Sequence, residues 1–265
     1  MPPSAPASLG SPLASDAPAT PRISIVVPTL NEEKTLAAVL EPLRAHADSL
    51  GLELIVSDGG SDDGTLAIAL SLADRVVTHE GPERQTIAEG RNAGAREAAC
   101  ASGDVLLFFN ADVDLPDEIE PFLSDLRGAA IARGAATCRV EVDPQEARIS
   151  ERIVLGTANR LYWAINRLRI VGMGRGEVHA VRRDVFEAVG GYREHLAAGE
   201  DFDLFKRILR QPGASVDFLW RHVVYESPRR YRQRGLLRTM SAWALNAAWV
   251  AFRDRSRSTE WEAVR

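Results

Sequence analysis

The sequence predicts an α/β fold in which a mainly parallel sheet is flanked by helices. Apolar segments of strand length alternate with segments of helical periodicity through residues 23–109, as expected of parallel strands joined by right-handed crossovers. Polar loops follow three of these strands, at residues 28–32, 57–64 and 110–114. In a doubly wound sheet such loops meet at one rim, where ligands bind.

Strands and helices alternate regularly in the first half. Apolar side chains recur at helical spacing from Leu36 to Leu50, whereas Pro28 is expected to stop the preceding strand and Pro42 to kink the helix. The predicted strands are 23–27, 52–56, 75–77 and 104–109, and the predicted helices are 36–50, 65–72 and 86–101.

The second half is less regular, and no internal repeat is visible in it. A long helix with an apolar and aromatic face is expected at 147–168. The other predicted elements are strands at 136–142 and 178–181 and helices at 183–189 and 201–210, the last stopped by Pro212-Gly213.

The composition is that of a globular protein, with 45% apolar and 26% charged residues in 265. Residues 1–21 are rich in Pro, Ala and Ser and lack a basic or apolar leader pattern, so we expect a disordered tail. The main domain is predicted at 22–226 and a basic helical extension at 227–265. Cys100 and Cys138 both lie in core-like segments, which favours a reduced, cytoplasmic protein.

The net charge of −5 hides an asymmetry. Residues 227–265 hold nine Arg against three acids, a balance of +6, so the other 226 residues carry −11. A basic extension on an acidic body indicates contact with phosphate or an anionic surface and does not indicate nucleic-acid binding. A solvated, Arg-rich helix is the alternative.

The apolar segment 239–252 has only fourteen residues, whereas about twenty are needed to span a bilayer. Trp243, Trp249 and flanking arginines suit a helix lying at the inner face of a membrane. Packing of the two tryptophans onto the main domain is the alternative.

Asp112 and Asp114 follow the buried apolar strand at 104–109. Two hard oxygen ligands at a strand exit suit Mg²⁺ or Mn²⁺ carrying a phosphorylated substrate. The alternative is a polar turn that leads into the next helix. Two other ligand-binding motifs are excluded. Loop 57–64 is no EF-hand calcium loop, because Asp63 stands where that loop needs Gly. The segment Gly172–Gly176 lacks the spacing of a dinucleotide-binding motif.

Five motifs in fixed order make the chain resemble a family-2 glycosyltransferase with the GT-A nucleotide-sugar fold. They are Ile25–Glu32, Val56–Thr65, Gly90–Gly94, the Ala111-Asp112 strand exit and Gly199-Glu200-Asp201, with Val189–Tyr192 ahead of the last. The resemblance covers roughly residues 22–212.

The resemblance implies a nucleotide site on the first two loops. Pro28, Thr29, Asn31 and Glu32 would line the base and ribose, and Asp58 would accept from the base imide N–H. Glu32 could instead favour a helix N-terminus by its charge.

The resemblance extends the donor site to the helix at 86–101 and the fourth strand. Arg91 and Asn92 would approach the diphosphate or ribose, although Arg91 could pair with a surface carboxylate instead. Ala111 marks the strand exit. Asn110 stands where the family often has Asp, which weakens a ribose contact but leaves an amide that can still accept or donate. Arg230, in an incomplete Gln-x-x-Arg-Trp motif, could pair with the diphosphate.

The remaining implied roles concern metal binding and chemistry. Asp112 is the expected metal ligand. Asp114 either ligates the metal through water or caps the next helix. Asp201 of the Glu200-Asp201 pair is the expected general base for one-step, inverting displacement; an acid pair favouring a helix N-terminus is the alternative.

The expected function is therefore metal-assisted transfer of a single sugar from a nucleotide-diphosphate-sugar donor to a hydroxyl acceptor that is lipid-linked, a glycan or a small molecule. Processive polymer synthesis is disfavoured because the Gln and Trp of the Gln-x-x-Arg-Trp motif are missing. A nucleotidyltransferase on a related sheet and a non-catalytic nucleotide-sugar-binding protein are the alternatives.

Overall fold

The computed structural model describes residues 22–98, 104–253 and 255–256. The predicted tail at 1–21, the predicted helix end at 99–101 with Cys100, and residues 257–265 of the extension lie outside the described residues. Cys138 is buried and unpaired. Within the described ranges, no helix is both long and apolar enough to cross a membrane.

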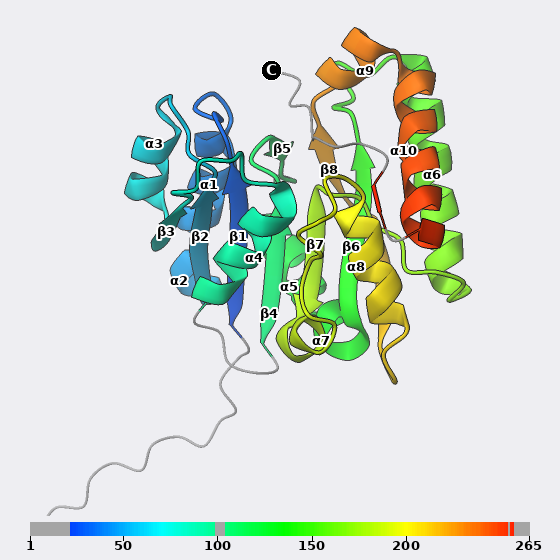
Figure 1. The fold of residues 1–265 in the computed structure, drawn as a ribbon, viewed down its shortest axis with the longest axis horizontal. Helices are drawn as coiled ribbons and strands as arrows, with labels where there is room; N and C mark the ends of the chain where they lie inside the picture. The colour runs from blue at the N-terminus through cyan, green and yellow to red at the C-terminus, as the bar shows by residue number, and fades with distance from the viewer. Residues whose placement is uncertain (1–21, 99–103, 254, 257–265) are drawn as a thin grey trace, which may run out of the picture.

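One eight-stranded mixed sheet forms the centre of the molecule, in the order β3-β2-β1-β4-β7-β6-β8-β5 (Figure 1). Strand β1 pairs in parallel with β2 and β4, and β2 pairs in parallel with β3. Strand β7 runs antiparallel to both β4 and β6. The strands are β1 Ile23–Thr29, β2 Leu52–Asp58, β3 Arg75–Thr78, β4 Val105–Phe109, β5 Val113–Asp114, β6 Gly134–Glu141, β7 Val178–Arg182 and β8 Ser215–Glu226.

Helices cover both faces of this sheet. One face packs on α1, α2, α3 and α5, and the other packs on α4, α7 and α8. The helices are α1 Leu36–Ala45, α2 Ala47–Leu50, α3 Thr65–Leu72, α4 Ile87–Glu97, α5 Ile119–Arg133, α6 Ile149–Arg167, α7 Arg183–Ala188, α8 Glu200–Leu209, α9 Arg229–Arg234 and α10 Leu236–Arg253.

The central strands show why the sheet is buried on both sides. In β4, Val105, Leu107 and Phe109 belong to one hydrophobic cluster, whereas Leu106 and Phe108 belong to the other. Successive side chains point to opposite faces of a strand, so a continuous apolar run fills both helix–sheet layers.

The structure corrects several predicted boundaries. β1 continues through Pro28, which pairs in register with Ser57 of β2. Pro42 lies inside α1, and the helical segment breaks instead at His46, between α1 and α2. Helix α4 keeps Thr86 as its N-cap, with a capping box formed by Glu89.

The second half contains elements that the sequence patterns did not predict. Strand β8 spans twelve residues, and its pairing with β6 shifts register between Cys138 and Arg139. This irregularity, and the polar residues along β8, obscure the alternation that marks a strand. The short β5, whose Val113 pairs with Glu226 of β8, and the helices α5 and α9 were not delimited either.

Helix α4 lies close against β1 because Gly94 faces it. A methyl group added at Gly94 would come within 2.3 Å of Val26 Cγ1. By contrast, Gly128 lies exposed in α5 with nothing within 4 Å of an added Cβ. The two helical glycines therefore have different roles.

Replacing Gly94 with Ala should lower the free energy of unfolding by about 1–3 kcal/mol, because the added methyl overpacks the α4–β1 contact. Gly128→Ala is the matched control and should raise stability by roughly 0.5–1 kcal/mol, since only backbone entropy changes there. Urea denaturation of both variants measures these effects. Equal effects of the two substitutions would contradict this account of α4 packing.

Candidate functional site

Two polar loops at the carboxyl ends of β1 and β2 are joined by hydrogen bonds. The Asn31 N–H donates to Ser61 Oγ at 2.8 Å, and the Asp62 N–H donates back to Asn31 Oδ1 at 2.8 Å. The Glu32 N–H donates to Thr65 Oγ1 at 2.7 Å. Asn31 has a φ of 57°, a left-handed conformation that Asn tolerates better than most residues. The predicted nucleotide loops therefore form one preorganised unit.

Asp58 lies at the centre of these loops and is 2% exposed. One of its carboxylate oxygens accepts from Thr29 Oγ1 at 3.1 Å, and the other accepts from the backbone N–H groups of Gly60 and Ser61. These bonds explain how Asp58 shapes the loop next to Pro28 and Thr29. Its contact with a nucleotide base stays a prediction.

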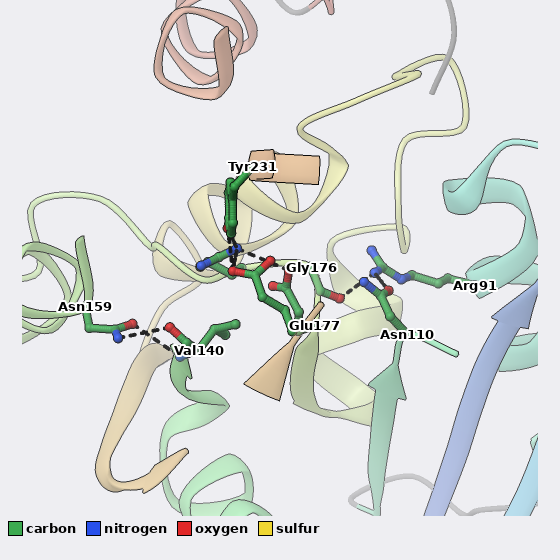
Figure 2. Close-up of polar contacts among 9 residues, drawn as sticks. Arg91, Asn110, Val140, Asn159, Gly176, Glu177 and Tyr231 are labelled. Atoms are coloured by element: carbon green, nitrogen blue, oxygen red, sulfur yellow. Dashed lines mark hydrogen bonds and ion pairs between the residues drawn. The ribbon is translucent and has the colours of Figure 1, made fainter. Parts of the chain in front are cut away.

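Arg91 is buried between α4, the exit of β4 and the start of α8, and its contact with a diphosphate or ribose stays a prediction. Its side chain is 0% exposed, and Nη1 donates to Glu200 Oε1 at 2.9 Å. Nη2 donates to Asn110 Oδ1 at 2.9 Å and to the Gly176 carbonyl at 2.6 Å (Figure 2). The guanidinium also lies over the Tyr192 ring, 5.2 Å from its centroid. Arg91 thus connects Glu200, Asn110 and Gly176 at the site.

Asn92 attaches α4 to the backbone of Tyr192, and its contact with the donor stays a prediction. Its side chain donates to the Tyr192 carbonyl at 2.8 Å and accepts from the Tyr192 N–H at 2.9 Å. Gly191 is left-handed, with φ +67°, and an added Cβ would meet Asn92 Oδ1 at 2.8 Å. The Val189–Tyr192 motif is therefore a tight turn that docks onto α4.

Asn110 and Ala111 occupy the exit of β4. The Asn110 N–H donates to the Glu177 carbonyl at 3.4 Å, while its side chain accepts from Arg91. Ala111 is 4% exposed and belongs to the core. A carboxylate at position 110 would add a charge beside Arg91, whereas the amide already satisfies that donor.

Asp112 and Asp114 face different neighbours, although both are exposed. Desolvation by surrounding atoms and the charge of Glu177 raise the pKa of Asp112, opposed by Arg230. Desolvation raises the pKa of Asp114 too, together with charges from a different region, Asp143 and Glu146. The structure therefore brings Asp112, and not Asp114, into the electrostatic surroundings of Arg230 and the site.

Glu200 and Asp201 begin α8 at the same site but have different surroundings. Glu200 is 5% exposed and paired with Arg91. Desolvation, followed by the charge of Glu200, raises the pKa of Asp201 to about 7. Asp201 Oδ1 accepts from the Phe202 N–H, while Oδ2 accepts no hydrogen bond from the described residues. Asp201 therefore combines a free oxygen with a pKa suited to a general base.

A second buried polar cluster, which the sequence analysis missed, lies beside this site. Arg175 Nη2 donates to Glu226 Oε1 at 2.6 Å, to Tyr231 Oη at 3.0 Å and to Glu177 Oε1 at 3.3 Å (Figure 2). Glu177 Oε2 is buried without a partner among the described residues. Desolvation raises the pKa of Glu226 to about 7. None of these residues belongs to the ordered motifs, so only a tertiary contact could reveal them.

The glycines before this cluster explain the segment that failed as a dinucleotide motif. An added Cβ at Gly172 would lie 2.1 Å from the Phe205 carbonyl oxygen, and one at Gly174 would lie 2.1 Å from the Phe205 ring. At Gly176 it would lie 3.5 Å from Arg91 Nη2 and 3.7 Å from Asp201 Oδ2. Small residues thus let this segment pass closely between α8 and the site.

Helix α10 contacts the turn that carries Asp201. Asn246 Nδ2 donates to the Ala198 carbonyl at 3.0 Å. Gly199 is left-handed, with φ +81°, and an added Cβ would meet Asn246 Nδ2 at 2.8 Å and Val250 Cγ2 at 3.3 Å. Trp243 of α10 lies beneath the guanidinium of Arg230, 5.8 Å from ring centroid to Cζ. The guanidinium of Arg175, in the main domain, lies 5.3 Å from the centroid of the Trp243 ring, whereas Trp249 is 39% exposed. The alternative of packing both tryptophans onto the main domain is therefore observed for Trp243 alone.

The residues around Asp112 fit a divalent cation held partly by substrate. No group of three or more His, Cys, Asp or Glu side chains is arranged to hold a metal within the described ranges. Mg²⁺ is commonly bound through one or two carboxylates plus substrate phosphates. Asp112 is exposed and its ionised form is disfavoured by desolvation and by Glu177, so a cation there would be stabilising.

Comparison with known proteins agrees with this arrangement. Residues 24–189 match the model of Glycosyl transferase family 2. The chain belongs to this family. Among curated family relatives, it is 30% identical over 192 residues to the succinoglycan biosynthesis protein ExoA of Rhizobium meliloti, covering 69% of this chain and 57% of ExoA. The chain thus spans less than two thirds of that relative's length.

Solved structures support the GT-A fold for this family-2 chain. The mannosyltransferase PcManGT of Pyrobaculum calidifontis, in complex with GDP-Man and Mn²⁺, matches with a TM-score of 0.59 and 20% identity over 83% of this chain and 63% of that one. Glucosyl-3-phosphoglycerate synthase of Mycobacterium tuberculosis, in complex with Mn²⁺, UDP and phosphoglyceric acid, also matches with a TM-score of 0.59 and 20% identity. This match covers 87% of this chain and 77% of that one.

Replacing Arg91 with Met should lower the free energy of unfolding by about 3–5 kcal/mol at neutral pH, because Glu200 then stays buried without a counter-charge. The control Arg96→Met removes an exposed pair with Glu194, with side chains 67% and 46% exposed, and should cost about 0–1 kcal/mol. Urea denaturation compares them. The double variant R91M/E200Q should recover most of the loss; no recovery would contradict the pairing.

The raised pKa of Asp201 predicts a pH-dependent stability effect. The fold disfavours ionised Asp201, so this destabilisation is absent below the unfolded-state pKa of about 4 and grows until the pH passes about 7. Asp201→Asn, which stays neutral, should raise Tm at about pH 8 by about 2–4 °C. Differential scanning fluorimetry should show the gain vanishing near pH 4. A gain that does not vary with pH would contradict this explanation.

Proposed function

We propose that this chain transfers a single sugar from a nucleotide-diphosphate-sugar to a hydroxyl acceptor, with inversion and with Mg²⁺ or Mn²⁺. The observation that carries the proposal is Asp201, a carboxylate with a pKa of about 7 and a free Oδ2 beside Arg91 and Asn110. A base poised near neutral pH can remove the acceptor proton as the hydroxyl attacks the anomeric carbon.

Different residues would bind the nucleotide and the cation. The joined loops around Asp58 would bind the nucleotide, since their backbone is already fixed. Asp112 would hold the cation, with Arg230 close enough to stabilise the diphosphate. A bound divalent cation supplies Lewis acidity that offsets the charge developing on the leaving nucleotide.

Glu200 and Arg91 would act as positioning residues. Their buried pair fixes the first turn of α8, and the charge of Glu200 raises the pKa of Asp201. The acceptor is proposed to be lipid-linked, a glycan or a small molecule, and the C-terminal helix to make peripheral contact with a membrane.

Substitutions at Asp112 and Asp201 should separate donor binding from turnover. Asp112→Ala should abolish the Mn²⁺-dependent thermal stabilisation by a nucleotide or nucleotide sugar, because the cation loses its ligand. Asp201→Ala should keep that stabilisation and lose about 10²–10⁴-fold in rate. Screening UDP-, GDP- and dTDP-sugars by thermal shift identifies the donor for both assays. Asp114→Ala serves as the control and should have the smaller effect.

The released products discriminate between the candidate activities. If Asp201 is the base, the rate of nucleoside diphosphate release should rise with pH, with the midpoint of the rise near pH 7. Pyrophosphate release would indicate nucleotidyl transfer. Donor binding without any nucleotide release would indicate a binding protein, and a fully active Asp201→Ala variant would exclude this residue as the base.

A further inference from the structure

Exposed large apolar side chains gather at one end of the molecule. Among the described residues, nine of the eleven that are prominently exposed lie in α6 with its following loop or in α10. They are Ile149, Ile153, Leu161, Trp163, Leu168, Ile170, Leu237, Leu245 and Trp249. Concentration of apolar surface at one place marks an interaction site, whereas single scattered residues do not.

Helices α6 and α10 form this end together. Leu155 of α6 shares a hydrophobic cluster with Met240 and Trp243 of α10, and both helices lie at one edge of the molecule, with α10 drawn in front of α6 (Figure 1). The outward residues of α10 between Arg238 and Arg253 are uncharged: Ser241, Ala242, Ala244, Leu245, Ala248 and Trp249. The guanidinium of Arg253 lies 4.5 Å from the centroid of the Trp249 ring.

Every exposed charge on these two helices is positive. Their exposed charged residues are Arg152, Arg160, Arg167, Arg238 and Arg253, whereas their single acid, Glu151, is 2% exposed. This is unusual in a chain of net charge −5. An apolar surface on two helices whose exposed charges are all arginines fits a bilayer that carries anionic lipids, because the apolar groups enter the interface and the arginines attract the headgroups.

We propose that α6 and α10 together form a docking face for an anionic membrane surface. The face includes α6, which extends the peripheral contact proposed for the C-terminal helix. A second copy of the chain is a poor occupant, because a two-fold contact would bring arginines of both copies together. Since no described helix can span a bilayer, the contact is interfacial.

Vesicle co-sedimentation of the full chain tests the proposal. Phosphatidylcholine vesicles containing phosphatidylglycerol should bind the protein, pure phosphatidylcholine vesicles should bind it weakly, and added salt should weaken the binding. Ile153→Glu in α6 and Leu245→Glu in α10 should each weaken it by about tenfold. Arg160→Ser and Arg238→Ser should each cost about fivefold.

Leu70→Glu is the matched control, because Leu70 is 67% exposed in α3, away from the docking face. It should bind vesicles like the unchanged protein, and circular dichroism checks that every variant is folded. Equal binding by Ile153→Glu, Leu245→Glu and the control would overturn the proposal, as would no binding to anionic vesicles. So would a dimer that these variants dissociate in light scattering. The test needs no sugar transfer, so it is independent of the proposed enzymology.

Discussion

The ion pair between Arg91 and Glu200 is the constraint on which the rest of the site depends. It joins residues 109 positions apart, one on α4 and the other at the start of α8, and their side chains are 0% and 6% exposed. Breaking such a pair leaves a buried charge, which is far more costly than the net stabilisation that the pair provides. Because Arg91 also bonds Asn110 and the Gly176 carbonyl, one guanidinium fixes β4, the glycine-containing segment and α8 relative to one another.

The cluster around Arg175 extends this constraint towards the C-terminal helices. Arg175 bonds Glu177 beside the β4 exit and Glu226 at the end of β8, and its guanidinium lies 5.3 Å from the Trp243 ring centroid. Adjacent residues of one segment, Arg175 and Gly176, therefore connect two polar networks. Asn159 of α6 exchanges two hydrogen bonds with the backbone of Val140 (Figure 2), which attaches that helix to β6.

Much of the fold followed from local patterns, whereas parts of the site did not. Helix α3 was predicted with its observed bounds, and β4 within one residue, because a helix that follows a turn-forming loop and a continuous apolar strand have strong local signals. Strand β8 was missed, since its register shift and its polar residues hide the alternation. The burial of Arg91 and its pairing with Glu200 were not predicted, because the order of the motifs says which residues lie near one another but not which of them are buried. Glu177 and Glu226 depend on contacts between distant segments, for which single-sequence periodicity carries no signal.

The left-handed turn at Gly199 has a consequence for how the protein is made. Asn246 and Val250 of α10 lie against this turn. Val250 also packs with Leu196 and Phe202, which lie on either side of the turn. Chains emerge from the ribosome with the N-terminus first, so the sheet and α8 leave the exit tunnel before α10 does. A nascent chain can therefore reach its native topology while the segment bearing Asp201 is still uncovered. The site is complete only after α10 has packed on the turn at Gly199.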